Sequence, residues 1–137
     1  MPVLTRIFAR RGGRSYSRGM TLFNRMEYAL AAVEFDRLLA GEKRPQSLDA
    51  KLARFYSAEA HAKVGMACYK AGNLKAARAE FERALGVQSH YPDLYAYLGI
   101  LDARDGRWAV AKDRLDTSLA LCPTQREALA ARIVVLE

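Results

Sequence analysis

Two stretches of this chain match each other at a fixed offset, and this internal repeat constrains the fold more than any other feature. Gly65 recurs as Gly99, an offset of 34 residues. Three further positions are identical at that offset: Gly72 and Gly106, Ala77 and Ala111, and Leu85 and Leu119. A repeat of this length is typical of one supersecondary unit stacked on copies of itself, each copy burying a face that it cannot bury alone. Function in such arrays lies on the surface that stacking creates.

A third copy precedes these two at an offset of 46 residues, the distance from Gly19 to Gly65. Because 46 is 34 plus 12, we infer an insert of about 12 residues after the second helix of the first copy. The insert contains Gly41 and Pro45, which favour the end of a helix. The three copies cover about 12–45, 58–91 and 92–125.

Each copy shows the periodicity of two helices separated by a break at glycine. The pattern predicts helices over 58–71, 74–86, 93–104 and 108–121. Small residues mark where paired helices approach closely, and we expect Gly65 to face Ala77 and Gly99 to face Ala111. Strand patterns are absent from the sequence.

The insert is expected to lengthen the first helix of the second copy. Ser47 is a suitable N-cap, and Asp49 in the first turn would interact favourably with the helix dipole. From Ser47 the chain can stay helical as far as Ala71.

Composition narrows the class of protein. At 137 residues and 51% hydrophobic content the chain is long enough for one domain with a core, and no run approaches the roughly 18 apolar residues of a membrane-spanning helix. Its two cysteines, Cys68 and Cys122, form no metal-binding or disulfide pattern. They favour a reducing compartment, and we expect a cytoplasmic protein, with attachment to a membrane surface as an alternative.

The net charge of +7 is concentrated at one end. Residues 1–26 hold six arginines and no acid, whereas the remainder has 16 basic and 15 acidic side chains. The segment 1–11 therefore forms a separate basic region, and 1–18 could contact an anionic membrane through a short amphipathic helix. There are three alternatives for this segment. It could be a cleavable targeting peptide, its apolar residues could dock in the groove of its own or a neighbouring chain, or it could be a tail that keeps the protein soluble.

The repeated residues carry a resemblance to a known family. The first helix of each copy contains a small glycine (Gly19, Gly65, Gly99), and a glycine stands at the turn of the second and third copies (Gly72, Gly106). The second helix contains an alanine (Ala31, Ala77, Ala111) and then a large apolar residue (Phe35, Phe81, Leu115). A proline, Pro123, closes the last full copy. The pattern resembles the tetratricopeptide repeat (TPR) family over about 12–137. The first copy departs from the pattern at Met26, which stands at the turn, and at Arg18, which stands at an apolar position, and these departures allow an irregular opening helix there. In the third copy, Asp102 replaces the expected aromatic residue.

The resemblance implies an all-α, right-handed superhelix of about three helix-turn-helix repeats closed by a capping helix over 126–137. It also implies a concave groove lined by the first helix of each repeat. The implied lining is Tyr16, Met20, Phe23, Asn24, Ala62, Met66, Tyr69, Lys70, Ala96, Ile100, Ala103, Arg104 and Val134. Four of these occupy one register and form an apolar stripe: Met20, Met66, Ile100 and Val134. Such a stripe suits an amphipathic helix or an apolar peptide, and the alternative is that it belongs to the inter-repeat core.

A polar row runs beside the stripe through Asn24, Lys70 and Arg104. It could bind acidic side chains, or it could simply offset helix dipoles at C-termini. The basic clamp by which some family members hold the C-terminal carboxylate of chaperones is not reproduced, because Tyr16 and Met20 stand where it would begin. We therefore do not expect co-chaperone activity.

No catalytic, metal or cofactor motif is found in the sequence. His61 and His90 are isolated from any nucleophile at motif spacing, and His61 replaces an aromatic at a packing position, so we interpret it as structural. Trp108 opens a helix where Tyr28 and Leu74 stand in the other copies, and we interpret it as packing. Basic residues are not interleaved with aromatic ones in the repeats, so nucleic acid is not an expected partner.

The sequence therefore predicts a non-enzymatic adaptor that binds a peptide or helix in its groove. The alternative is a membrane-surface assembly protein that attaches through its basic N-terminus and self-associates through its repeats, forming a homo-oligomer. Leu129, Ile133 and Leu136 would cover the last hairpin. Val134 and Val135 are apolar, whereas the outer face of a capping helix is normally polar. They predict either a longer natural chain or contact with another protein.

Overall fold

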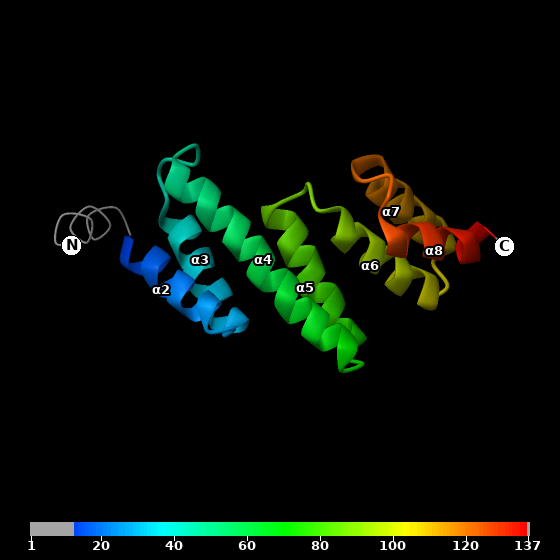
Figure 1. Cartoon of the computed structure of the whole chain (residues 1–137), viewed down its shortest axis with the longest axis horizontal. Helices are drawn as coiled ribbons and strands as arrows, with labels where there is room; N and C mark the ends of the chain where they lie inside the picture. Colours follow the sequence, from blue (N-terminus) through cyan, green and yellow to red (C-terminus); the bar gives the residue numbers. More distant parts are fainter. Residues whose placement is uncertain (1–12, 137) are drawn as a thin grey trace.

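The computed structural model describes residues 13–136, and the side chains of residues 16–135. This part of the chain is entirely helical apart from its turns and short loops (Figure 1). The helices are α2 (Gly13–Asn24), α3 (Tyr28–Gly41), α4 (Leu48–Lys70), α5 (Leu74–Val87), α6 (Pro92–Arg104), α7 (Trp108–Leu121) and α8 (Arg126–Leu136). The basic segment 1–11, with its expected amphipathic helix, lies outside the described residues.

The helices form three antiparallel hairpins that follow one another along the molecule. The hairpins are α2–α3, α4–α5 and α6–α7, and α8 packs on both helices of the last one. Figure 1 shows this progression from the blue end to the red end. The predicted all-α solenoid is confirmed, and the four predicted helices of the second and third copies match the observed ones to within a residue or two, except that α4 begins ten residues before 58.

The early start of α4 is the insert predicted from the sequence. The Ser47 side chain accepts a hydrogen bond from the Ala50 amide at 3.1 Å, and Asp49 lies in the first turn. The helix runs for 23 residues to Lys70, roughly 34 Å at 1.5 Å per residue. The predicted long first helix is therefore confirmed, including its cap.

One packing relationship recurs in every hairpin, between a glycine of the first helix and a large side chain 16 residues later. A Cβ atom placed on Gly65 would lie 2.6 Å from Cε1 of Phe81. The equivalent distances are 2.7 Å from Gly19 to Phe35 and 2.8 Å from Gly99 to Leu115. The predicted approach of Gly99 to Ala111 is confirmed, since a Cβ atom on Gly99 would lie 3.3 Å from the Ala111 carbonyl oxygen. The nearest atoms at both Gly65 and Gly99 nevertheless belong to the ring or branched side chain, which enters the space that the missing Cβ leaves.

The first hairpin is regular despite its sequence departures. Its turn residue, Met26, adopts a φ of 63°, the left-handed conformation that Gly72 and Gly106 adopt at φ 84° and 76° in the other two turns. Non-glycine residues are disfavoured there by contact between Cβ and the backbone. Helix α2 spans Gly13–Asn24, so the irregular opening helix does not occur within the described residues.

A buried carboxylate replaces the aromatic residue expected in the third copy. Asp102 is fully buried, and its Oδ1 accepts a hydrogen bond from Nη1 of Arg78 at 2.6 Å. Nε of Arg114 lies 2.9 Å from Oδ2, an ion pair without hydrogen-bond alignment. Since the arginines come from α5 and α7, the carboxylate of α6 joins three helices across two hairpins.

Candidate interaction groove

The residues predicted to line a groove lie on α2, α4, α6 and α8, and their exposure differs. The exposed ones are Asn24, Lys70, Arg104 and Val134, and the half-buried ones are Tyr16, Met20, Phe23, Met66, Tyr69, Ile100 and Ala103. Ala62 and Ala96 are buried by neighbouring helices. We therefore leave these two alanines out of the surface proposed below.

At the N-terminal end, the predicted lining residues pack mainly within the protein. The ring centroid of Phe23 lies 5.1 Å from that of Tyr28 and 5.4 Å from that of Tyr56. The ring of Tyr16 meets Phe35 edge-on at 6.0 Å. The contact of Phe23 with Tyr56 fixes the first hairpin against α4.

In the middle, aromatic rings join the second hairpin to the third. Tyr97 of α6 stacks on Phe81 at 5.7 Å and meets Tyr69 edge-on at 5.5 Å. The guanidinium carbon of Arg104 lies 6.0 Å from the centre of the Tyr69 ring, within the range of a cation–π contact. Met66 packs against the same buried cluster. This part of the predicted lining therefore consists of aromatic rings packed against one another.

At the C-terminal end, the structure forms an apolar hollow of about 570 Å³ between α6, α8 and the start of α7. Its lining residues are Ile100, Ala103, Arg104, Trp108, Glu127, Ala130, Ala131, Val134 and Val135. Four predicted groove residues therefore come together here: Ile100, Ala103, Arg104 and Val134. A second hollow of about 500 Å³ lies beside the start of α6, but its lining is more polar, and its Glu59 already accepts a hydrogen bond from Tyr91 at 2.7 Å.

Trp108 was interpreted from sequence as a packing residue, and the structure corrects this. Its side chain is 52% exposed and lines the hollow. Tyr28, at the same register in the first copy, packs edge-on against Phe23. Sequence register cannot separate the two roles, because they depend on which helices follow each hairpin.

The hollow has a charged group at each end. Arg104 lies in the last turn of α6, and Glu127 lies in the first turn of α8. Glu127 accepts a hydrogen bond from the side-chain amide Nε2 of Gln125 at 2.7 Å, and neither charge forms an ion pair among the described residues. Lys70, in the last turn of α4, extends the basic rim toward the second hairpin.

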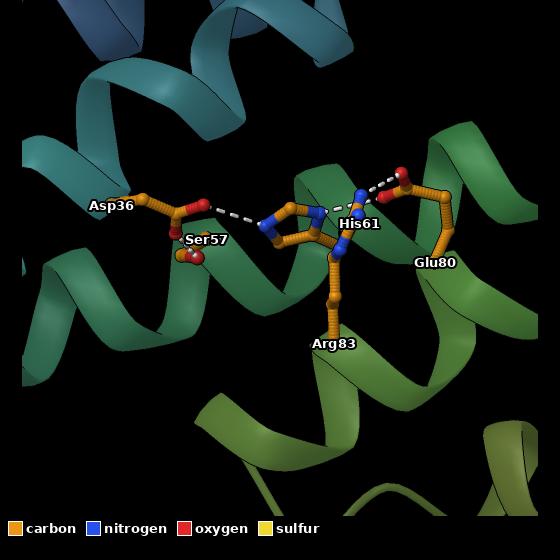
Figure 2. Close-up of polar contacts among 5 residues, drawn as sticks. All are labelled: Asp36, Ser57, His61, Glu80 and Arg83. Atoms are coloured by element: carbon orange, nitrogen blue, oxygen red, sulfur yellow. Dashed lines mark hydrogen bonds and ion pairs between the residues drawn. The ribbon is translucent and has the colours of Figure 1, made fainter.

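Away from the hollow, a polar network centred on His61 links α3, α4 and α5 (Figure 2). Nε2 of His61 lies 2.8 Å from Oδ2 of Asp36, and Nδ1 lies 2.7 Å from Oε2 of Glu80. Ser57 donates a hydrogen bond to Asp36 at 2.6 Å, and Arg83 donates one to Glu80 at 2.7 Å. Because both ring nitrogens face carboxylate oxygens, only the doubly protonated ring satisfies both contacts.

The surroundings shift the titration of this network. The hydrogen bond to Asp36 raises the pKa of His61; burial opposes it and the contact with Glu80 adds to it. For Asp36, burial alone would raise the pKa, but the hydrogen bonds from His61 and Ser57 outweigh it and lower the pKa. Each group therefore favours the charged form of the other.

The geometry of this network indicates a structural role. Ser57 donates to Asp36 and not to the imidazole, and its side chain is fully buried, so no nucleophile–base pair faces solvent. His61 is 7% exposed, which agrees with its interpretation as a packing residue. Sequence reasoning missed its partners because Asp36 and Glu80 lie 25 and 19 residues away, on other helices.

Residues 13–136 contain neither a cluster of metal-ligand side chains nor a membrane-spanning helix. Within this range, no group of three or more histidine, cysteine, aspartate or glutamate side chains could hold a metal ion. None of the helices described there combines the length and the apolar character needed to cross a bilayer.

Comparison with solved structures relates this architecture to TPR domains. The second TPR domain of human RPAP3, solved in complex with the HSP70 peptide SGPTIEEVD, matches with a TM-score of 0.52 at 18% identity, over 95% of this chain and 98% of that one. The first TPR of Spaghetti (RPAP3), bound to the HSP90 peptide SRMEEVD, matches with a TM-score of 0.54 at 16% identity, over 92% and 90%. No family model and no curated protein matches the chain.

A third TPR structure comes from a different kind of protein. The C-terminal TPR-containing domain of an FK506-binding protein of Plasmodium falciparum matches with a TM-score of 0.53 at 14% identity, over 94% of this chain and 88% of that one. At these identities the likeness concerns the fold. The protein therefore has the fold of a TPR domain, as its repeat pattern predicted.

Proposed function

We propose that this protein is a non-enzymatic interaction module that binds a segment of another protein in a groove along α2, α4, α6 and α8. The observation that carries the proposal is the apolar hollow, where Ile100, Trp108 and Val134 present accessible side chains at one place. Two structures of the same fold hold peptides, which supports a peptide as the type of ligand.

The apolar lining favours a different ligand from the chaperone peptides that those two proteins hold. Both peptides end in the acidic sequence EEVD or MEEVD. In this chain the register of the stripe is occupied by Met20, Met66 and Ile100, which supply no positive charge. We therefore propose that apolar anchors provide most of the binding energy, since burying one valine- or leucine-sized side chain contributes roughly 1.5–3 kcal/mol.

A peptide selection with matched valine variants tests the proposal. Random peptides displayed on phage are selected on the wild-type protein, and the affinity of the selected peptides is then measured on Val134→Glu and Val33→Glu. Both valines are exposed, at 64% and 51%, so both variants should fold, but only Val134 lines the hollow. Val134→Glu should weaken binding about tenfold or more, because a carboxylate replaces an apolar contact, and Val33→Glu should not. Equal binding by the two variants would remove the groove assignment.

A further inference from the structure

The charges at the two ends of the hollow are opposite and separated along it. The side-chain amide Nε2 of Gln125, just before α8, donates a hydrogen bond to Asp93 in the first turn of α6 at 3.1 Å, so α6 and α8 begin side by side. Glu127 is therefore at the end of the hollow where both helices start. Arg104 is at the end where α6 stops.

The apolar part of the lining lies between these charges. Val134 stands seven residues after Glu127 on α8, roughly 10 Å along the axis at 1.5 Å per residue. Ile100 stands one turn before Arg104 on α6. The hollow thus presents a negative end, an apolar middle and a positive end in sequence.

From this arrangement we infer that the hollow selects a short segment of another protein in which a large apolar side chain lies between a basic and an acidic residue. The inference rests on the proposed function and specifies the ligand of the same site. The apolar side chain packs between Ile100 and Val134, the acidic residue faces Arg104, and the basic residue faces Glu127. Arg104 is available for such a carboxylate, since among the described residues it contacts the Tyr69 ring and forms no ion pair with an acid.

Charge and shape disfavour two other occupants. An anionic membrane surface would be repelled by Glu127 at one end of the hollow. A second copy packed by two-fold symmetry would bring Arg104 of one chain opposite Glu127 of the other, but two concave hollows that face each other would not fill one another. Both remain as outcomes that the experiment distinguishes.

The fluorescence of Trp108 reports directly on whether the hollow is occupied, because Trp108 is the single tryptophan of the chain and lines the hollow. The probes are four capped peptides built on Lys-Ser-Leu-Ser-Asp, in which alternate side chains share a face and the charged residues are roughly 13 Å apart in extended form. The other three replace the charged pair by two lysines, two aspartates or two glutamines. Each is titrated into the wild type and into Arg104→Glu, Glu127→Lys and the double exchange.

The inference predicts a specific pattern of preferences. The wild type should bind the mixed peptide about fivefold more tightly than either like-charged peptide, a difference that shrinks at high salt. Arg104→Glu should prefer the doubly basic peptide, and Glu127→Lys the doubly acidic one. The double exchange should again prefer the mixed peptide. Both positions are exposed at helix ends, so circular dichroism should show unchanged helix content.

Other results would overturn the inference, and they separate it from the proposed function. The same order of affinities on all four proteins would leave an apolar site without charge selection. No Trp108 response to any peptide would refute the inference, while a Val134-sensitive response to phage-selected peptides would still support the groove. A Trp108 emission that changes with protein concentration alone would assign the hollow to a second copy. A response to phosphatidylserine vesicles but to no peptide would assign it to a membrane.

Discussion

The ring of Phe81 occupies the space that a side chain at Gly65 would need. A Cβ atom on Gly65 would lie 2.6 and 2.7 Å from two ring carbons, and the Phe81 side chain is itself fully buried. The ring cannot move away without disturbing the core between the second and third hairpins. This glycine therefore sets the distance between α4 and α5.

Substitution of Gly65 by alanine should destabilise the protein. Overpacking in a rigid core costs about 1–3 kcal/mol, and the gain in helix propensity of about 1 kcal/mol offsets only part of it. Gly86→Ala is the matched control, because a Cβ there meets nothing within 4 Å. Urea denaturation should show Gly65→Ala less stable and Gly86→Ala slightly more stable than wild type. A stabilised Gly65→Ala would mean that the helices are less closely packed than described.

The contribution of His61 to stability should depend on pH. Its pKa is raised in the folded protein, so its stabilising effect is fully present below pH 6.5, the unfolded value, and is lost as pH rises through the folded pKa. The pKa of Asp36 is lowered in the folded protein, so the stabilising effect of this carboxylate is fully present above pH 3.8, the unfolded value, and is lost as the pH falls through the folded pKa.

The test compares His61→Gln with wild type by denaturation across pH. We expect a difference of about 2 kcal/mol at pH 6, typical of hydrogen bonds between charged groups, that narrows in alkaline solution. His90→Gln, at an exposed histidine outside the network, is the control and should leave the profile unchanged. A constant difference for His61→Gln at every pH would contradict the protonated bridge.

Removal of the buried carboxylate of Asp102 should destabilise the protein far more than removal of the exposed carboxylate of Asp105. Asp102→Ala leaves two arginines without their buried partner and should cost about 2–4 kcal/mol, less than for fully buried pairs because Arg78 and Arg114 are partly exposed. Asp105, whose side chain is 57% exposed, is the other carboxylate bound to Arg78, and Asp105→Ala should cost less than about 1 kcal/mol. Thermal or urea unfolding of the two variants measures both, and equal losses would show that Asp102 has no special role.

Replacing Met26 by glycine should stabilise the first hairpin. Met26 holds a φ of 63° and its side chain is 74% exposed, so little packing is lost and backbone strain is relieved. The expected gain is about 0.5–1 kcal/mol after the entropy of glycine is counted. Gly72→Ala, at the equivalent turn, should have the opposite effect in the same denaturation assay. A loss of stability in Met26→Gly would indicate that the methionine side chain stabilises the turn.

The repeat pattern was sufficient to predict the hairpins, because periodicity and turn glycines act over short distances. Ser47 was likewise recognisable as a cap, since a cap bonds an amide three residues ahead. Contacts between helices were not predictable in the same way. The pairing of His61 with Asp36 and Glu80, and of Gly65 with Phe81, depends on how the helices cross.

The predicted groove shows the same limit. Register placed Ile100 and Val134 on one stripe, and the structure brings them into one hollow. Register also placed Ala62 and Ala96 in the lining, where neighbouring helices bury them. Trp108 was missed because its exposure depends on tertiary packing: Trp108 is exposed and lines the hollow beside α8, whereas Tyr28 at the same register packs on Phe23.

The most direct test of the groove is a methyl NMR titration of the labelled protein with a phage-selected peptide. If the hollow is the binding site, the methyl signals of Ile100 and Val134 and the indole signal of Trp108 shift on binding, while the methyl signals of Leu30 and Val33 on α3 do not. Shifts confined to α3, or spread evenly over both surfaces, would contradict it.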